Sequence, residues 1–136
     1  MKKIVAFFMA GLAGALLASD LSVTKGSYEY AYGLYKHGKF DEAYADFSSL
    51  CKNGSDKSCS MKAIMDFNGE GVVANKEAAI NEFKSLCDKN EAMACGKLGE
   101  LYTYGYDRKN VKLEQIEAVL KKACEGGYAP SCDLAK

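Results

Sequence analysis

The sequence predicts an all-α fold, a short α/α-repeat solenoid of about three helix pairs cross-linked by disulfides. Six cysteines fall in three pairs, each eight positions apart, at residues 51 and 59, 87 and 95, and 124 and 132. The pairs recur after 36 and then 37 residues, a period typical of helical repeats. Apolar residues precede the first cysteine of each pair by eight, four and one positions, which is the spacing of one helix face.

These apolar positions predict one helix in each repeat, near residues 41–52, 76–88 and 112–125. The apolar face of these helices is formed by Ala43, Phe47, Leu50, Ala79, Phe83, Leu86, Ile116, Leu120 and Ala123. We expect the helices to end at Asn53-Gly54, Asn90 and Gly126-Gly127, because a residue in the left-handed conformation commonly closes a helix.

A second helix is predicted before each of these, at residues 28–36, 58–67 and 92–104, and a glycine-containing turn separates the two. We call the first helix of each pair the A helix and the second the B helix. One pair cannot bury its apolar face alone, so neighbouring pairs must stack. The predicted repeats span residues 27–57, 58–93 and 94–130, and a terminal helix stub covers residues 131–136.

The periodicity also predicts the disulfides Cys51–Cys59, Cys87–Cys95 and Cys124–Cys132, although six cysteines allow other pairings. A continuous helix would separate the Cα atoms of residues 51 and 59 by about 12 Å, more than the ~7 Å that a disulfide tolerates. A chain reversal between the two cysteines removes this conflict. The spacing fits neither the usual zinc ligand pattern nor a C-x-x-C redox motif, so we expect no metal and no cofactor.

The N-terminus predicts export. Lys2 and Lys3 precede an uncharged, mostly apolar run that is too short for a membrane-spanning helix of about 20 residues. Residues 1–19 are therefore interpreted as a signal peptide, with the cleavage site left open, and residues 20–136 as the mature repeat domain. We expect a periplasmic or secreted protein with no membrane span once the signal peptide is removed.

The charge balance narrows the class of partner. Lys and Arg together number 18, as do Asp and Glu, and the formal net charge is zero. A nucleic-acid-binding domain would carry a basic excess, so we expect no nucleic-acid partner. The partner that we expect, from the groove described below, is a peptide, a protein or a peptidoglycan-related ligand, and the oligomeric state stays open.

Local motifs add a family resemblance that covers residues 28–136. Residues 94–105 resemble the A helix of a Sel-one-like repeat, with its Leu-Gly and Tyr-x-x-Gly pattern, whereas residues 28–50 are closer to a tetratricopeptide unit. With the Cys-x7-Cys pairs and the signal peptide, the chain resembles the Helicobacter cysteine-rich protein family. Lys62-Ala63 and Asp66 depart from the pattern in the second repeat.

The resemblance implies a right-handed superhelix of paired helices in a secreted or periplasmic protein. Related repeats serve as interaction modules, and some members have been classed as penicillin-binding proteins or weak β-lactamases. A penicillin-binding protein with weak β-lactamase activity is therefore the alternative to a binding module. Its only candidate catalytic residues are the S-x-x-K matches Ser22–Lys25 and Ser49–Lys52, since the K-T-G motif is absent and Ser55-Asp56 lacks the following Asn.

A binding module would use the concave surface that the A helices of a solenoid line. Tyrosine offers apolar area and a hydroxyl at low entropic cost, and it is dense in the predicted A helices. The groove candidates that follow are Tyr30, His37, Asn68, Glu100 and Tyr104. Tyr35 and Tyr102 fall at repeat packing positions, where they would contact the partner helix instead.

Overall fold

The computed structural model describes residues 23–136, so the predicted signal peptide and Ser22 lie outside the described residues. This range contains helices and no strands, and none of its helices is long and apolar enough to cross a membrane. The helices are α2 (Tyr28–Lys36), α3 (Phe40–Lys52), α4 (Asp56–Asn68), α5 (Lys76–Asp88), α6 (Ala92–Thr103), α7 (Leu113–Glu125) and α8 (Pro130–Leu134). The all-α prediction is confirmed, and the predicted helix limits differ from those observed by at most two residues.

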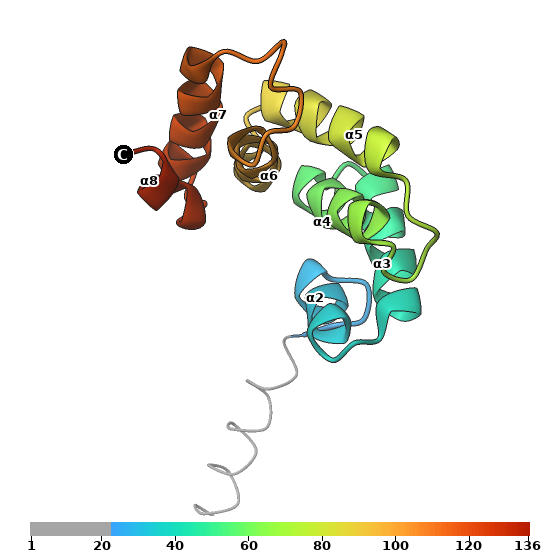
Figure 1. Cartoon of the computed structure of the whole chain (residues 1–136). Coiled ribbons are helices and arrows are strands. Elements are labelled where there is room, and N and C mark those ends of the chain that lie inside the picture. Colours follow the sequence, from blue (N-terminus) through green and yellow to red (C-terminus); the bar gives the residue numbers. More distant parts are fainter. Residues whose placement is uncertain (1–22) are drawn as a thin grey trace, which may run out of the picture.

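The helices form an arc of two rows (Figure 1). The A helices α2, α4 and α6, followed by the short α8, line its inner side, and the B helices α3, α5 and α7 form the outer side. Each helix packs against the next along the chain, and α6 also contacts both α4 and α8. This is the stacking of helix pairs expected of a short α-repeat.

Local sequence fixes the ends of the helices. The side chains of Ser27, Ser55, Asn75 and Glu91 each accept a hydrogen bond from a backbone N–H in the first turn of the helix that follows, which satisfies a donor with no partner inside that helix. Left-handed residues occur after the three B helices, as predicted: Gly54, Asn90 and Gly127 have φ angles of 98°, 66° and 96°.

The core consists of two hydrophobic clusters joined by Ile64, which packs against both. The first cluster centres on Phe47 between α2, α3 and α4, and the second on Phe83 between α4, α5, α6 and α7. Of the nine residues predicted to form the apolar face of the B helices, seven are buried, and Leu50 and Ile116 are half-buried. The helical period therefore identified the buried face of the B helices, whereas the buried residues of the A helices, such as Met65 and Leu98, were not among those predicted.

The three predicted disulfides are present, and each joins the last turns of a B helix to the start of the next A helix. The Cα–Cα distances are 4.6, 4.6 and 4.8 Å, within the usual range for a disulfide. Cys87 and Cys95 are 3% and 0% exposed and belong to the core. The chain reversal after each B helix thus brings together cysteines that a continuous helix would keep apart.

Two glycines on α6 allow the last two helices to approach closely. A Cβ atom on Gly99 would lie 2.5 Å from the side chain of Leu120 on α7, and one on Gly96 would lie 2.2 Å from the ring of Tyr128, just before α8. Real Cβ atoms do not come so close to other heavy atoms. Glycine at these positions therefore sets the spacing between α6 and the helices that follow it.

Candidate functional site

A pocket of about 130 Å³ lies between α4 and α6. Its lining is mostly apolar, and each of the two helices adds one polar side chain, Asn68 on α4 and Lys97 on α6. The apolar lining residues are Ile64, Phe67, Phe83 and Leu101. Phe83 belongs to α5, in the outer row, and is 2% exposed, so it forms the floor. The pocket therefore opens on the inner side of the arc.

Helical spacing explains how these residues meet. On α4, Ile64, Phe67 and Asn68 follow the i, i+3, i+4 pattern of one helix face. On α6, Lys97 and Leu101 lie one turn apart and face the same pocket. The facing sides of α4 and α6 thus form the walls of the pocket, and Phe83 of α5, the helix between them in sequence, forms its floor.

The rim near α6 carries a charged network. Lys97 Nζ donates to Glu100 Oε2 at 2.9 Å, and the hydroxyl of Tyr128 donates to Glu100 Oε1 at 3.3 Å. Burial alone would lower the pKa of Lys97, but the neighbouring Glu100 and Tyr128 raise it overall. Lys97 therefore stays protonated, and its hydrogen bond to Glu100 holds it at the edge of the pocket.

The rim near α4 is polar as well. Asn68 Nδ2 donates to Glu70 Oε2 at 3.3 Å, and both groups are near the end of α4. Burial raises the pKa of Tyr35 on α2, and the nearby Glu70 raises it further, whereas Lys97 on α6 lowers it. The charges of Glu70, just after α4, and of Lys97 on α6 therefore both act on Tyr35 of α2 across the inner face.

Three of the four tyrosines of α2 form a stack along one side of that helix. The ring centroids of Tyr28 and Tyr32 are 5.9 Å apart, those of Tyr32 and Tyr35 are 6.3 Å apart, and both pairs are nearly parallel. Lys57 of α4 lies 4.0 Å from the centroid of the Tyr28 ring. Burial raises the pKa of the Tyr28 hydroxyl to about 12, with smaller contributions from neighbouring Tyr and Glu side chains. Tyr28 and Tyr35 pack against the cluster around Phe47, whereas Tyr32 between them is 38% exposed.

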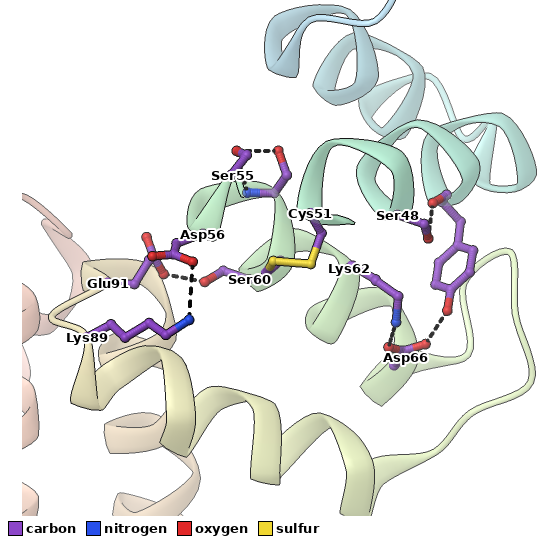
Figure 2. Close-up of a disulfide and its surroundings, with 12 residues drawn as sticks. Ser48, Cys51, Ser55, Asp56, Ser60, Lys62, Asp66, Lys89 and Glu91 are labelled. Carbon is purple, nitrogen blue, oxygen red and sulfur yellow. Dashed lines mark hydrogen bonds and ion pairs between the residues drawn. A yellow bond between two sulfur atoms is a disulfide. The ribbon is translucent and has the colours of Figure 1, made fainter. Parts of the chain in front are cut away.

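Two sets of polar contacts, one on each side of the Cys51–Cys59 disulfide, fix α4 relative to its neighbours (Figure 2). Ser60 on α4 is fully buried and donates to Glu91, which also caps the start of α6. Around the Cys51–Cys59 disulfide, Asp66 accepts from Lys62 and from the hydroxyl of Tyr44, each at 2.8 Å. The carboxylates of Glu91 and Asp66 therefore tie α4 to α6 and to α3, and they hold the walls of the pocket in place.

The predicted groove residues lie in different places. Asn68 lines the inner pocket, and Glu100 belongs to the network at its rim. Tyr30 and His37 instead line a second pocket on α2, and the ring nitrogen Nδ1 of His37 lies 2.8 Å from the carbonyl oxygen of Gly33. Tyr104 is 82% exposed and lines none of the pockets described here. The structure therefore places two of the five candidates at the inner pocket and two at the pocket on α2, and Tyr104 lies apart from both.

The most important lining residues were not among those candidates. Ile64, Phe67 and Leu101 are half-buried apolar side chains, and helical periodicity cannot distinguish them from core residues. Their one distinguishing feature in the sequence is their position on A helices, on the side that faces a neighbouring A helix. Which side of an A helix faces its neighbour depends on how the helix pairs stack, and the apolar period within one helix does not determine this stacking.

The S-x-x-K candidates occupy exposed positions. Ser49 and Lys52 are exposed in the last turns of α3, and Lys25 is exposed before α2. Ser22 lies outside the described residues, so its arrangement with Lys25 is not described. None of the three described side chains lines the inner pocket.

One cluster resembles a metal site by composition. The ligand atoms of Cys51, Cys59 and Glu82 lie within 4.8 Å of one another. However, the two sulfur atoms are bonded to each other, and a metal binds the thiolate form of cysteine. This cluster in the described part of the chain therefore offers one carboxylate and no thiolate.

The sequence matches no protein-family model, and no curated protein matches it at a significant level of similarity.

Proposed function

We propose that the chain is an exported binding module that holds an extended peptide or protein segment along its inner face, with one apolar side chain in the pocket between α4 and α6. The pocket itself carries this proposal. At about 130 Å³ it is smaller than the ~300–1,000 Å³ of typical small-molecule sites and suits a single side chain. Residues 94–105 resemble Sel-one-like repeats, which serve as interaction modules, and this likeness supports the same function.

The chemistry of the walls favours a peptide over a sugar. Ile64, Phe67, Phe83 and Leu101 offer no hydrogen-bond partner in their side chains. A sugar hydroxyl placed against them would lose its hydrogen bonds to water without replacement, at a cost of about 1–3 kcal/mol for each group. An apolar side chain gains by the same burial, and polar groups at the rim are available to the backbone of the ligand.

The disulfides support the exported location. Disulfides persist in oxidising compartments and are rare in the cytosol, and all six cysteines are paired. Together with the signal peptide predicted for residues 1–19, this favours the periplasm or the exterior of the cell as the place where a partner is met.

Site-specific photo-crosslinking tests the proposal. The photoreactive residue p-benzoylphenylalanine replaces Asn68, which is exposed at the pocket rim, and in a matched control it replaces Asn81, which is exposed on the outer helix α5. We expect the Asn68 probe to capture a defined partner from an extract of the cell envelope, and the Asn81 probe to capture none of it.

A second substitution in the pocket makes this result specific. Leu101→Glu introduces a charge into the lining, so the adduct at residue 68 should fall at least about tenfold, equivalent to about 1.4 kcal/mol. Circular dichroism establishes that this variant remains helical. Equal capture by both probes, or capture unaffected by Leu101→Glu, would show that the inner pocket is not the binding site.

A further inference from the structure

The second cysteine of each disulfide aligns the A helix α4 with the A helix α6. Two and six residues after that cysteine, α4 has Met61 and Met65, whereas α6 has Lys97 and Leu101. In each helix the two positions lie one turn apart on the same face. The two A helices therefore present different side chains at equivalent places, two methionines in α4 and a lysine and a leucine in α6.

The residue that these side chains meet on the preceding B helix is the same in both repeats. It is Phe47 on α3 and Phe83 on α5, each four residues before the first cysteine of its pair. Phe47 is fully buried in one cluster with Met61 and Met65, which are 3% and 0% exposed. In this first interface between an A helix and the B helix before it, two methionine side chains thus fill the space beside the phenylalanine.

The second interface leaves that space partly open. Lys97 and Leu101 are half-buried, and both line the pocket of about 130 Å³ that has Phe83 as its floor. Glu100 accepts a hydrogen bond from Lys97 Nζ at 2.9 Å and holds this polar end at the rim, outside the apolar lining. Because leucine is also shorter than methionine, α6 leaves unfilled the volume that the two methionines of α4 occupy in the first interface.

Given the binding function proposed above, on which this step rests, we infer that the ligand side chain in the pocket is methionine. Methionine is unbranched and flexible, so it fills irregular gaps between helices. Its sulfur also makes favourable contacts with aromatic rings, and the lining contains the rings of Phe67 and Phe83. The partner is therefore a peptide or protein segment with an accessible methionine, which completes the second interface as Met61 and Met65 complete the first.

Binding of short peptides to the oxidised mature chain, followed by NMR, tests this assignment. The probes are the tripeptides acetyl-Ala-X-Ala-amide with methionine, leucine, phenylalanine, methionine sulfoxide or alanine at X. The readout is the shift of the methyl signals of Ile64 and Leu101, which line the pocket. We expect the methionine peptide to bind at least about tenfold more tightly than the alanine peptide, the effect of burying one apolar side chain, and more tightly than the leucine and phenylalanine peptides. The sulfoxide peptide should bind no better than the alanine peptide, because its polar oxygen finds no partner among the apolar walls.

A variant that fills the pocket from within makes the test specific. Lys97→Met gives α6 the residue that α4 has at the equivalent position, so the binding of the methionine peptide should fall at least about tenfold. The urea midpoint of this variant should be no lower than that of the wild type, which establishes that the fold is kept. Lys121→Met is the matched control, since the Lys121 side chain is 74% exposed on α7, away from the pocket, and the same change there should leave binding as it is.

The outcomes separate the choice of side chain from the binding site itself. Tighter binding of the leucine or phenylalanine peptide, or full binding of the methionine peptide by Lys97→Met, would overturn the assignment of methionine and leave a peptide-binding pocket in place. If none of the five peptides shifts the methyl signals at about 10 mM, both the methionine assignment and the proposed binding site are wrong.

Discussion

Reduction of the three disulfides is expected to destabilise the chain strongly. Each disulfide closes a loop between residues eight positions apart, and the loss of unfolded-state entropy gives about 2.6 kcal/mol for each, or at most about 8 kcal/mol for all three. The whole stability of a domain is typically ~5–15 kcal/mol. The disulfides therefore account for a large part of the stability of so short a stack.

Urea unfolding followed by circular dichroism at 222 nm measures this effect on oxidised and fully reduced protein. We expect the reduced protein to lose its cooperative transition, or to unfold at a much lower urea concentration. A reduced protein with an unchanged midpoint would show that packing alone holds the helices.

The central disulfide should matter more than the last one. Cys87 and Cys95 are buried in the core, whereas Cys124 and Cys132 are half-buried and join the five-residue helix α8. Replacing both Cys87 and Cys95 by serine also buries two hydroxyls, each at a cost of about 1–3 kcal/mol if it lacks a partner. The Cys124→Ser, Cys132→Ser variant is the matched control, and it should lose only the effect of loop closure.

Phe83→Ala is expected to destabilise the chain by about 3–5 kcal/mol, the range for removing a buried aromatic ring. Phe83 is 2% exposed at the centre of the larger core cluster, and its ring also forms the floor of the inner pocket. The substitution therefore leaves a cavity that opens toward the binding face. It also removes contacts that connect α5 with α4 and α6.

The free energy of unfolding in urea measures the loss, with Val73→Ala as the control. Val73 is 89% exposed, so its truncation should change stability by less than about 0.5 kcal/mol. If Phe83→Ala proved as stable as Val73→Ala, the larger cluster would not be the core that stabilises the stack.

The cysteine spacing was the most informative feature of the sequence. It predicted the helix pairs, the turns and the disulfides, because an eight-residue separation is compatible with a disulfide only when the chain reverses between the two cysteines. The two apolar stripe positions that are only half-buried, Leu50 and Ile116, have local causes. Ile116 borders the groove that α8 leaves open, while Leu50 lies in the last turn of α3, at the edge of the first cluster.

The binding residues were harder to predict because residue type was the wrong guide. Tyrosine and histidine indicated a groove, yet Tyr30 and His37 lie on the α2 surface and Tyr104 is almost fully exposed. Position on the A helix determines which side chains line the pocket. Ile64 and Leu101 line it because the arc brings α4 and α6 together, an arrangement that the apolar periodicity of the single helices does not specify.

The central claim is that local disulfides hold an exported stack of helix pairs in shape. Its most direct test is peptide mapping by mass spectrometry, without reduction, of the protein isolated from the cell envelope or the culture medium. We predict three cross-linked peptides, containing Cys51 with Cys59, Cys87 with Cys95, and Cys124 with Cys132. Any exchanged pair, or free thiols at these six positions, would contradict it.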